Sequence, residues 1–105
     1  MESKAKMDKF TEQIMADKPV LVDFYTEWCG PCQSMPHELN KLKHKLGDAI
    51  SIIKVDIDHN KRVAATYNVR SVPTMMLFHN GKVRWRQTGI TSASQLETVI
   101  SKHNY

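Results

Sequence analysis

Two cysteines, Cys29 and Cys32, are the residues of this sequence whose type and spacing most clearly suggest chemistry. They are its only cysteines, and Gly30 and Pro31 separate them in the stretch EWCGPCQSMPHEL. A pair at this spacing can be a structural cross-link, two ligands of a metal ion, or a thiol reagent that exchanges disulfides. The elements that position the pair decide which of the three we expect.

The pair falls between an expected strand and an expected helix. The apolar run VLVDFY, residues 20–25, is typical of a strand in a sheet that is covered on both faces. From Cys32 to Leu46 the apolar residues recur at steps of three and four, which predicts a helix that Gly47 ends. Cys29 would then lie at a helix amino terminus, where unpaired N–H groups and the helix dipole stabilise a thiolate.

This position predicts different roles for the two thiols. Cys29 is expected to be exposed, with a pKa lowered from about 8.5 toward about 7, while Cys32 is shielded in the first helical turn. Cys29 would attack a disulfide of a substrate protein, and Cys32 would then attack Cys29 and release the reduced substrate. The cycle leaves Cys29 and Cys32 oxidised, so a separate reductant must restore them.

Two charged residues interrupt the apolar runs near this pair. Burial of Asp23 in VLVDFY should raise its pKa toward neutrality, where its carboxylate can accept a proton. Lys54 is the charged residue that interrupts the second apolar run, ISIIKVDI, residues 50–57. We interpret this run as a second buried strand. We prefer a catalytic role for the two charges over a buried structural ion pair or a frayed strand that exposes them to water.

The rest of the chain completes an alternating pattern of helices and strands. Helices are expected at residues 7–17, at about 60–67, and after Ser92, which has capping-box spacing to Gln95. The order of helix, strand, helix, strand, helix, hairpin and helix predicts an α/β fold. Its mixed sheet should carry helices on both faces.

The expected hairpin joins TMMLFH to KVRWRQ through Asn80 and Gly81, a dipeptide that favours a tight turn. Side-chain alternation along its second strand should place three basic residues on one face and two apolar residues on the other. These residues are Lys82, Arg84 and Arg86, and Val83 and Trp85.

Composition limits the class of protein. The chain has 105 residues, of which 41% are apolar and 25% charged, so we expect one domain over residues 1–105, with residues 1–6 as a disordered or short strand lead. The net charge of +4 fits a solvated helix face and an edge strand better than nucleic-acid binding. MESKAKMDKF has no apolar run of signal-peptide or membrane-span length, so a cytoplasmic protein that does not bind membranes is expected.

Several motifs in order make the sequence resemble the thioredoxin family. They are VDFYTEWCGPC, Lys54 and Asp58 in KVDID, SVPT around Pro73, NGK at residues 80–82, and Gly89, and the resemblance covers roughly Phe10 to the carboxyl end. It implies the thioredoxin fold, with a central mixed sheet of four or five strands. It also implies a protein-disulfide reductase whose only cofactor is its own redox-active disulfide.

The resemblance also implies roles for individual residues. Cys29 would attack, Cys32 would resolve, and Asp23 would assist proton transfer beside Lys54. A cis peptide bond should precede Pro73 and lie against the cysteines. The implied substrate-binding surface consists of Trp28, Gly30, Pro31, Val72, Pro73, Gly89 and Ile90. The implied partners are disulfide-containing proteins and a flavin-dependent thioredoxin reductase, and a monomer is expected.

The sequence departs from the family pattern at several places. The amino end lacks an apolar alternation, so the usual first strand is expected to be weak or missing. Tyr25 stands where many relatives carry Trp, and Ser71 replaces a common glycine. Neither substitution removes a reacting group.

The position of the helix proline is a further departure. Pro36 comes four residues after Cys32, whereas the family proline normally comes five after, at the position of His37. A proline at residue 36 cannot donate to the carbonyl of Cys32. We therefore predict a kink at Met35–Pro36, a Cys32 carbonyl that is unpaired or bound to water, and a second helical segment that Pro36 opens.

Three other interpretations of the cysteines remain. A zinc site needs four ligands, and the five histidines are scattered without a second cysteine pair. A redox-inactive binding module would not need Asp23 and Lys54 together with the cysteines. An oxidising or isomerising exchanger usually varies the two residues that here are Gly30 and Pro31.

Overall fold

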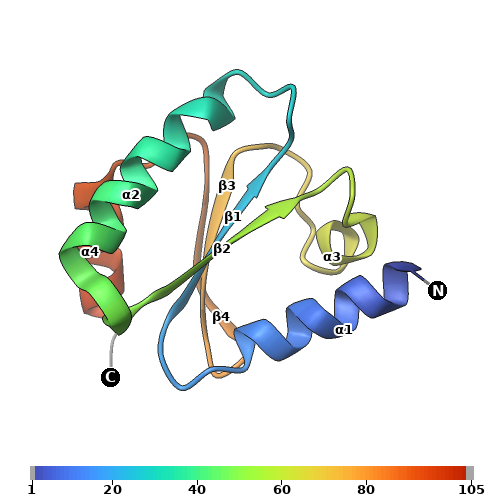
Figure 1. Cartoon of the computed structure of the whole chain (residues 1–105), viewed down its shortest axis with the longest axis horizontal. Coiled ribbons are helices and arrows are strands. Elements are labelled where there is room, and N and C mark those ends of the chain that lie inside the picture. The colour runs from blue at the N-terminus through green and yellow to red at the C-terminus, as the bar shows by residue number, and fades with distance from the viewer. Residues whose placement is uncertain (1, 104–105) are drawn as a thin grey trace.

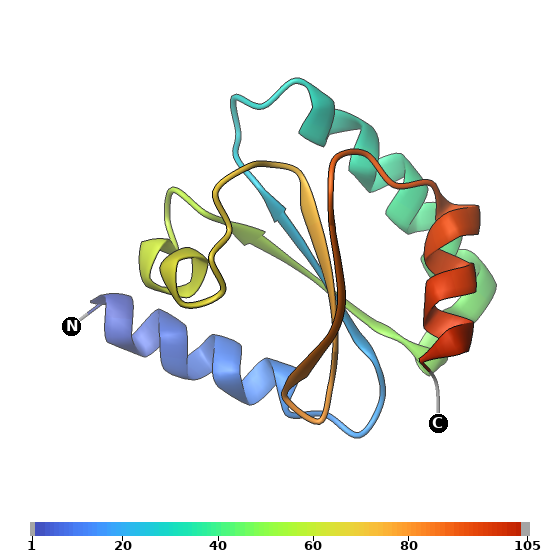
Figure 2. The same cartoon turned by 180° about the vertical axis from the view of Figure 1, so that it is seen from behind.

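A four-stranded sheet forms the centre of the protein, with helices on both faces (Figures 1 and 2). The computed structural model describes residues 2–103. The strands are β1 (Val20–Tyr25), β2 (Ser51–Asp56), β3 (Thr74–His79) and β4 (Lys82–Thr88), in the spatial order β2-β1-β3-β4. β1 runs parallel to β2 and antiparallel to β3, and β3 runs antiparallel to β4. The predicted mixed sheet is confirmed with four strands.

Two helices cover each face of the sheet. α1 (Glu2–Ile14) and α3 (Lys61–Thr66) lie on one face, while α2 (Met35–Leu46) and α4 (Ala93–Lys102) lie on the other (Figure 1). Because side chains alternate along a strand, β1 contributes Val22 and Phe24 to the α1 and α3 layer and Leu21 to the α2 and α4 layer. β1 is thus covered on both faces, as its continuous apolar run predicted.

The first helix begins earlier than the sequence suggested. Of residues 1–6, expected to be a disordered or short strand lead, residues 2–6 belong to α1, and residue 1 lies outside the described residues. Lys4, Ala5 and Lys6 are strong helix formers, and Lys4 pairs with Asp8 one turn later at 3.9 Å. α1 also ends at Ile14 rather than at residue 17. The carbonyl of Ile14 accepts a hydrogen bond from the N–H of Gly81 in the hairpin turn, at 2.9 Å, instead of one from the next helical turn.

The second strand is not fully buried as predicted. β2 pairs only with β1 and forms an edge of the sheet, so half of its residues are half-buried and Lys54 is exposed. A run of apolar residues cannot distinguish a central strand from an edge strand whose one neighbour is buried. This correction matters at the site, because it gives the Lys54 ammonium access to water.

The hairpin forms as predicted, but its second strand contains a bulge. Asn80 and Gly81 both have positive φ, at 54° and 79°, as a type I′ turn requires. Leu77 pairs with Trp85 and Phe78 pairs with Val83, so Arg84 is an extra residue in β4.

The bulge at Arg84 makes the predicted division of β4 into a basic and an apolar face wrong. Trp85 packs against the core beneath α2 and α4, whereas Val83 shares a face with Phe78 on the α1 and α3 side. Arg86 also turns to that side, where its Nη1 donates to the Tyr67 carbonyl at 2.7 Å.

The last helix is capped from two directions. Ser92 Oγ accepts from the Gln95 N–H at 3.1 Å, which confirms the predicted cap. Glu38 of α2 accepts from the Ala93 N–H at 2.8 Å, and this hydrogen bond lowers the pKa of the Glu38 carboxyl. The second contact joins α2 to the start of α4. Within residues 2–103, the helices all fall short of the length and apolar content needed to cross a bilayer.

Candidate active site

Cys29 and Cys32 lie just beyond the carboxyl end of β1, in the loop that leads into α2 at the top of Figure 1. Their sulfur atoms form a disulfide, and their Cα atoms are 5.3 Å apart. A short 3₁₀ turn, Pro31–Ser34, connects this loop to α2. Pro31 can begin the turn because the first helical N–H has no partner in any case. The predicted placement between a strand and a helix is confirmed.

The two sulfurs do not differ in exposure as predicted. Cys29 is 6% exposed and Cys32 is 5% exposed. The loop that contains Val72 covers Cys29, whose Sγ lies 3.7 Å from the Val72 carbonyl oxygen. What distinguishes the two is their polar contacts, because the Cys32 N–H donates to Cys29 Sγ at 3.2 Å. That N–H is positioned to stabilise negative charge on Cys29.

The helix changes type one residue before the predicted place, and Met35 rather than Pro36 opens the second helical segment. The chain passes from a 3₁₀ turn to α2 between Ser34 and Met35, so Pro36 is the second residue of the α-helix. The Cys32 carbonyl accepts from the Met35 N–H. The prediction of an unpaired or water-bound carbonyl is therefore wrong: a 3₁₀ bond from residue 35 replaces the α-helical bond that Pro36 cannot make.

Exchanging Pro36 and His37 should change the reduction potential of the Cys29–Cys32 pair. In the double variant Pro36→His with His37→Pro, residue 36 regains an N–H that can donate to the Cys32 carbonyl and extend α-helical geometry toward Cys29. A better aligned helix dipole stabilises the Cys29 thiolate, so we expect the reduction potential to rise by roughly 5–20 mV. Equilibration with glutathione buffers measures it. His37→Gln is the control, and an unchanged or lower potential would contradict this account.

Asp23 is buried at the centre of the sheet beneath the disulfide. It is 2% exposed, and burial raises the pKa of its carboxyl to about 6, although the positive charge of Lys54 partly offsets this rise. Its Oδ1 makes no hydrogen bond within residues 2–103. The frayed-strand alternative is therefore wrong for Asp23.

Lys54 stands beside Asp23 in the parallel register of β1 and β2. The two side chains form no direct ion pair within the described part of the chain, and Lys54 is exposed. The interpretation of Asp23 and Lys54 as a buried structural ion pair is therefore wrong.

A cavity of about 230 Å³ connects Asp23 to the cysteine pair. Its lining residues are Asp23, Tyr25, Thr26, Glu27, Cys32, Gln33, Pro36 and Lys54. A cavity of this size, with Asp23, Glu27 and Lys54 among its lining residues, has room for water molecules that could relay a proton between the Asp23 carboxyl and Cys32. The cavity therefore joins a group able to hold a proton to one of the two sulfurs.

The residues expected to bind substrate surround the disulfide. Trp28 is 76% exposed, and its indole Nε1 donates to Asp58 Oδ2 at 2.9 Å. Ile90 is 51% exposed, and Gly30 and Pro31 are exposed as well.

Two loops complete this surface on the other side of Cys29. The Val72–Pro73 peptide bond is cis, and the Pro73 carbonyl accepts from the Gly89 N–H at 2.8 Å. Val72 and Gly89 are half-buried and Pro73 is buried. The structure thus brings the cysteine loop, the Pro73 loop and the loop after β4 to the same end of the molecule.

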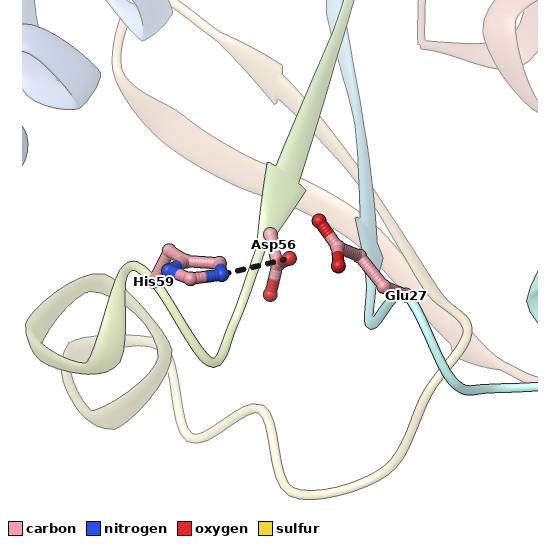
Figure 3. Close-up of side chains that lie close together, drawn as sticks. All are labelled: Glu27, Asp56 and His59. Carbon is pink, nitrogen blue, oxygen red and sulfur yellow. Dashed lines mark ion pairs between the residues drawn. The ribbon is translucent and has the colours of Figure 1, made fainter.

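Sequence reasoning missed a cluster of polar side chains beside this surface. Glu27, Asp56 and His59 converge where β1 and β2 end (Figure 3). No spacing signal could have found them, because Glu27 is far from the other two in sequence. The parallel pairing of Tyr25 with Asp56 brings them together.

Comparison with known proteins agrees with the geometry. A family profile described as Thioredoxin matches residues 2–102. "Thioredoxin Y, chloroplastic" from Oryza sativa is 44% identical over 81 residues, which cover 77% of this chain, and the chain spans about half (48%) of that protein. The "Thioredoxin" of Rickettsia typhi is 37% identical over 91 residues, which cover 87% of each chain.

A solved structure extends the agreement to the fold. A mutant thioredoxin from Halobacterium salinarum superposes with a TM-score of 0.84 at 30% sequence identity. The match covers 93% of this chain and 85% of that one. The four-stranded sheet with helices on both faces is thus shared with a solved protein.

Proposed function

Because this chain belongs to the thioredoxin family, we propose that it reduces disulfide bonds in other proteins by dithiol–disulfide exchange. Two electrons pass from the Cys29 and Cys32 thiols to the substrate disulfide. The substrate leaves with two thiols, and the protein leaves with the Cys29–Cys32 disulfide. The disulfide at a helix start, with the Cys32 N–H directed at Cys29 Sγ, carries this proposal.

The polar contacts of the sulfurs support separate roles. Cys29 is the attacking thiol, because the Cys32 N–H and the start of the helix favour its thiolate. Cys32 is the resolving thiol, which must lose a proton before it attacks Cys29. Asp23 accepts that proton through the cavity that both residues line, and Lys54 limits how far burial raises the pKa of Asp23.

An extended segment of the substrate protein binds across the surface around Cys29. The residues of this surface are Trp28, Gly30, Pro31, Val72, Pro73, Gly89 and Ile90. The exposed Trp28 and Ile90 side chains support apolar contact with the segment, and Trp28 is held in place by Asp58. Cys29 Sγ lies beside the Val72 carbonyl, so a segment bound along Val72 would bring its disulfide to the attacking sulfur.

Removing the hydrogen bond to Trp28 should weaken substrate binding more than chemistry. In Asp58→Ala the indole loses its acceptor, whose net contribution of about 0.5–1.5 kcal/mol corresponds to a roughly 2- to 10-fold rise in KM for insulin. The kcat should change less, because the sulfurs are not touched. Steady-state insulin reduction measures both constants. Asp48→Ala is the control on an exposed acid of the 3₁₀ turn Gly47–Ala49, and an equal change in that variant would contradict the assignment.

The cycle requires a partner that returns electrons. We propose a flavin-dependent thioredoxin reductase, which the family membership supports, and a monomer as the working form. The cytoplasm is the proposed compartment, because its thiol pool is reducing.

An insulin-reduction assay with dithiothreitol as electron source tests the function. We expect the protein to accelerate reduction above the uncatalysed rate, and we expect a Cys29–Cys32 potential between roughly −220 and −320 mV. A potential well above that range would identify an oxidising exchanger. Absence of acceleration would identify a binding module.

A further inference from the structure

Three side chains with metal-binding atoms meet at the end of the sheet, next to the substrate surface. Glu27 follows β1, Asp56 ends β2, and His59 lies in the turn after β2 (Figure 3). One ligand atom from each lies within 4.8 Å of the others. Two carboxylates and an imidazole form a mixed oxygen and nitrogen donor set, which suits divalent transition ions such as Zn²⁺.

Asp56 is the fixed member of this group, and one of its two carboxylate oxygens faces the other two side chains (Figure 3). The residue is 8% exposed. Its Oδ1 accepts from the Asp58 N–H at 2.9 Å, which orients the carboxylate. Its Oδ2 has only His59 Nε2 at 3.8 Å, too far for a hydrogen bond, within residues 2–103. This second oxygen faces the other two side chains and is not among the buried polar atoms that lack a partner, so an ion could reach it from solvent (Figure 3).

A second carboxylate, that of Glu27, lies beside Asp56. Glu27 makes no hydrogen bond or ion pair with another described residue, and one of its carboxylate oxygens lies within 4.8 Å of a carboxylate oxygen of Asp56. A cation placed between two carboxylates is attracted by both of them.

We propose that Glu27, Asp56 and His59 bind one divalent transition-metal ion of the Zn²⁺ type. In tetrahedral coordination the ligand atoms would lie about 3.3 Å apart, so the group must contract from its present spacing. Asp56 stays fixed, while the exposed side chains of Glu27 and His59 rotate toward it. The Lys6 Nζ, which donates to the His59 carbonyl at 2.6 Å, holds the backbone of the turn while the imidazole moves. Water completes the coordination.

The ion would connect the loop after β1 to the turn after β2. Glu27 is adjacent to Trp28, and Asp58, the hydrogen-bond partner of Trp28, is adjacent in sequence to His59. A bound ion would therefore immobilise both sides of the Trp28 contact. This site does not involve the sulfurs, so the proposal stands independently of the proposed disulfide reduction.

Calorimetric titration of the oxidised, untagged protein with Zn²⁺ tests the proposal. The oxidised form is required because free Cys29 and Cys32 thiols would bind zinc themselves. We expect saturable binding of one Zn²⁺ per chain. His59→Gln and Asp56→Asn should each weaken it at least about tenfold, since each removes a ligand. His59→Gln is decisive, because that exposed side chain can change without disturbing the core.

His44→Gln is the matched control, since His44 is an exposed histidine on α2 distant from the cluster. It should leave the affinity unchanged, and a large excess of Mg²⁺ should not displace Zn²⁺ from the imidazole-containing site. Absence of saturable binding, or equal affinity in wild type and His59→Gln, would overturn the proposal.

Discussion

Replacement of Cys32 by serine is expected to abolish turnover and to trap substrate proteins on the enzyme. Cys29 keeps its helix-start position and still attacks a substrate disulfide. The mixed disulfide then persists, because serine cannot displace the substrate from Cys29. Insulin reduction should therefore fall by about 100-fold or more, as expected when a covalent step loses its second nucleophile.

The structure explains why the trap should be selective for Cys29. The Cys29 Sγ accepts a hydrogen bond from the backbone N–H of residue 32. A serine at position 32 retains this N–H. The neighbouring Val72 carbonyl lies 3.7 Å away, on the side where a substrate segment would bind. Cys32 instead lines the cavity that it shares with Asp23.

Non-reducing electrophoresis and intact-mass spectrometry measure the trapped species. Cys32→Ser should accumulate a covalent adduct with insulin chains that dithiothreitol releases. Cys29→Ser is the matched control and should form little adduct, since its remaining thiol is not stabilised in the same way. Accumulation of adduct by Cys29→Ser instead of Cys32→Ser would show that the two roles are reversed.

Replacement of Asp23 by asparagine should stabilise the protein in a pH-dependent way. Burial raises the pKa of the Asp23 carboxyl from 3.8 to about 6. Below about pH 3 the carboxyl is protonated in both the folded and the unfolded state, and no penalty arises; at pH 4 the penalty is still small. Between pH 4 and 6 the unfolded state ionises first, so folding loses stability as the pH rises. Above pH 6 the penalty is constant at about 3 kcal/mol.

Urea unfolding of the oxidised protein at pH 4 and pH 8 measures this penalty. Asp23→Asn should increase the free energy of unfolding by up to about 3 kcal/mol at pH 8 and by little at pH 4. The same variant should slow insulin reduction at neutral pH, because Cys32 loses its proton acceptor. Glu12→Gln, on the exposed side of α1, is the control. Equal effects of Asp23→Asn at the two pH values would contradict the assigned pKa.

Local signals in the sequence predicted most elements, because local contacts form them. The apolar spacing from Met35 to Leu46 describes α2, and Gly47 ends it with a positive φ of 55°. Asn80–Gly81 specified the hairpin turn, and Ser92 specified the start of α4. In each case the residues that decide the structure lie within four positions of each other.

The errors arose where distant segments decide the outcome. Whether β2 is central or at an edge depends on how many strands pair with it. The bulge at Arg84 depends on the fit of β4 to β3, and it moved Val83 and Trp85 to opposite faces. The exposure of Cys29 depends on the loop that contains Val72, which covers the sulfur from more than forty positions away in sequence.

The thiol chemistry of the cysteine pair could be predicted from the sequence, whereas the surroundings of the pair could not. The cysteine spacing, the strand before it and the helix after it already identified the pair as a thiol reagent, because these features are local. Only the tertiary structure decided that Asp23 and Cys32 share a cavity and that Lys54 reaches water. Only the parallel pairing of β1 with β2 brought Glu27, Asp56 and His59 together, since residues from different strand ends meet through sheet register, which no spacing along the chain encodes.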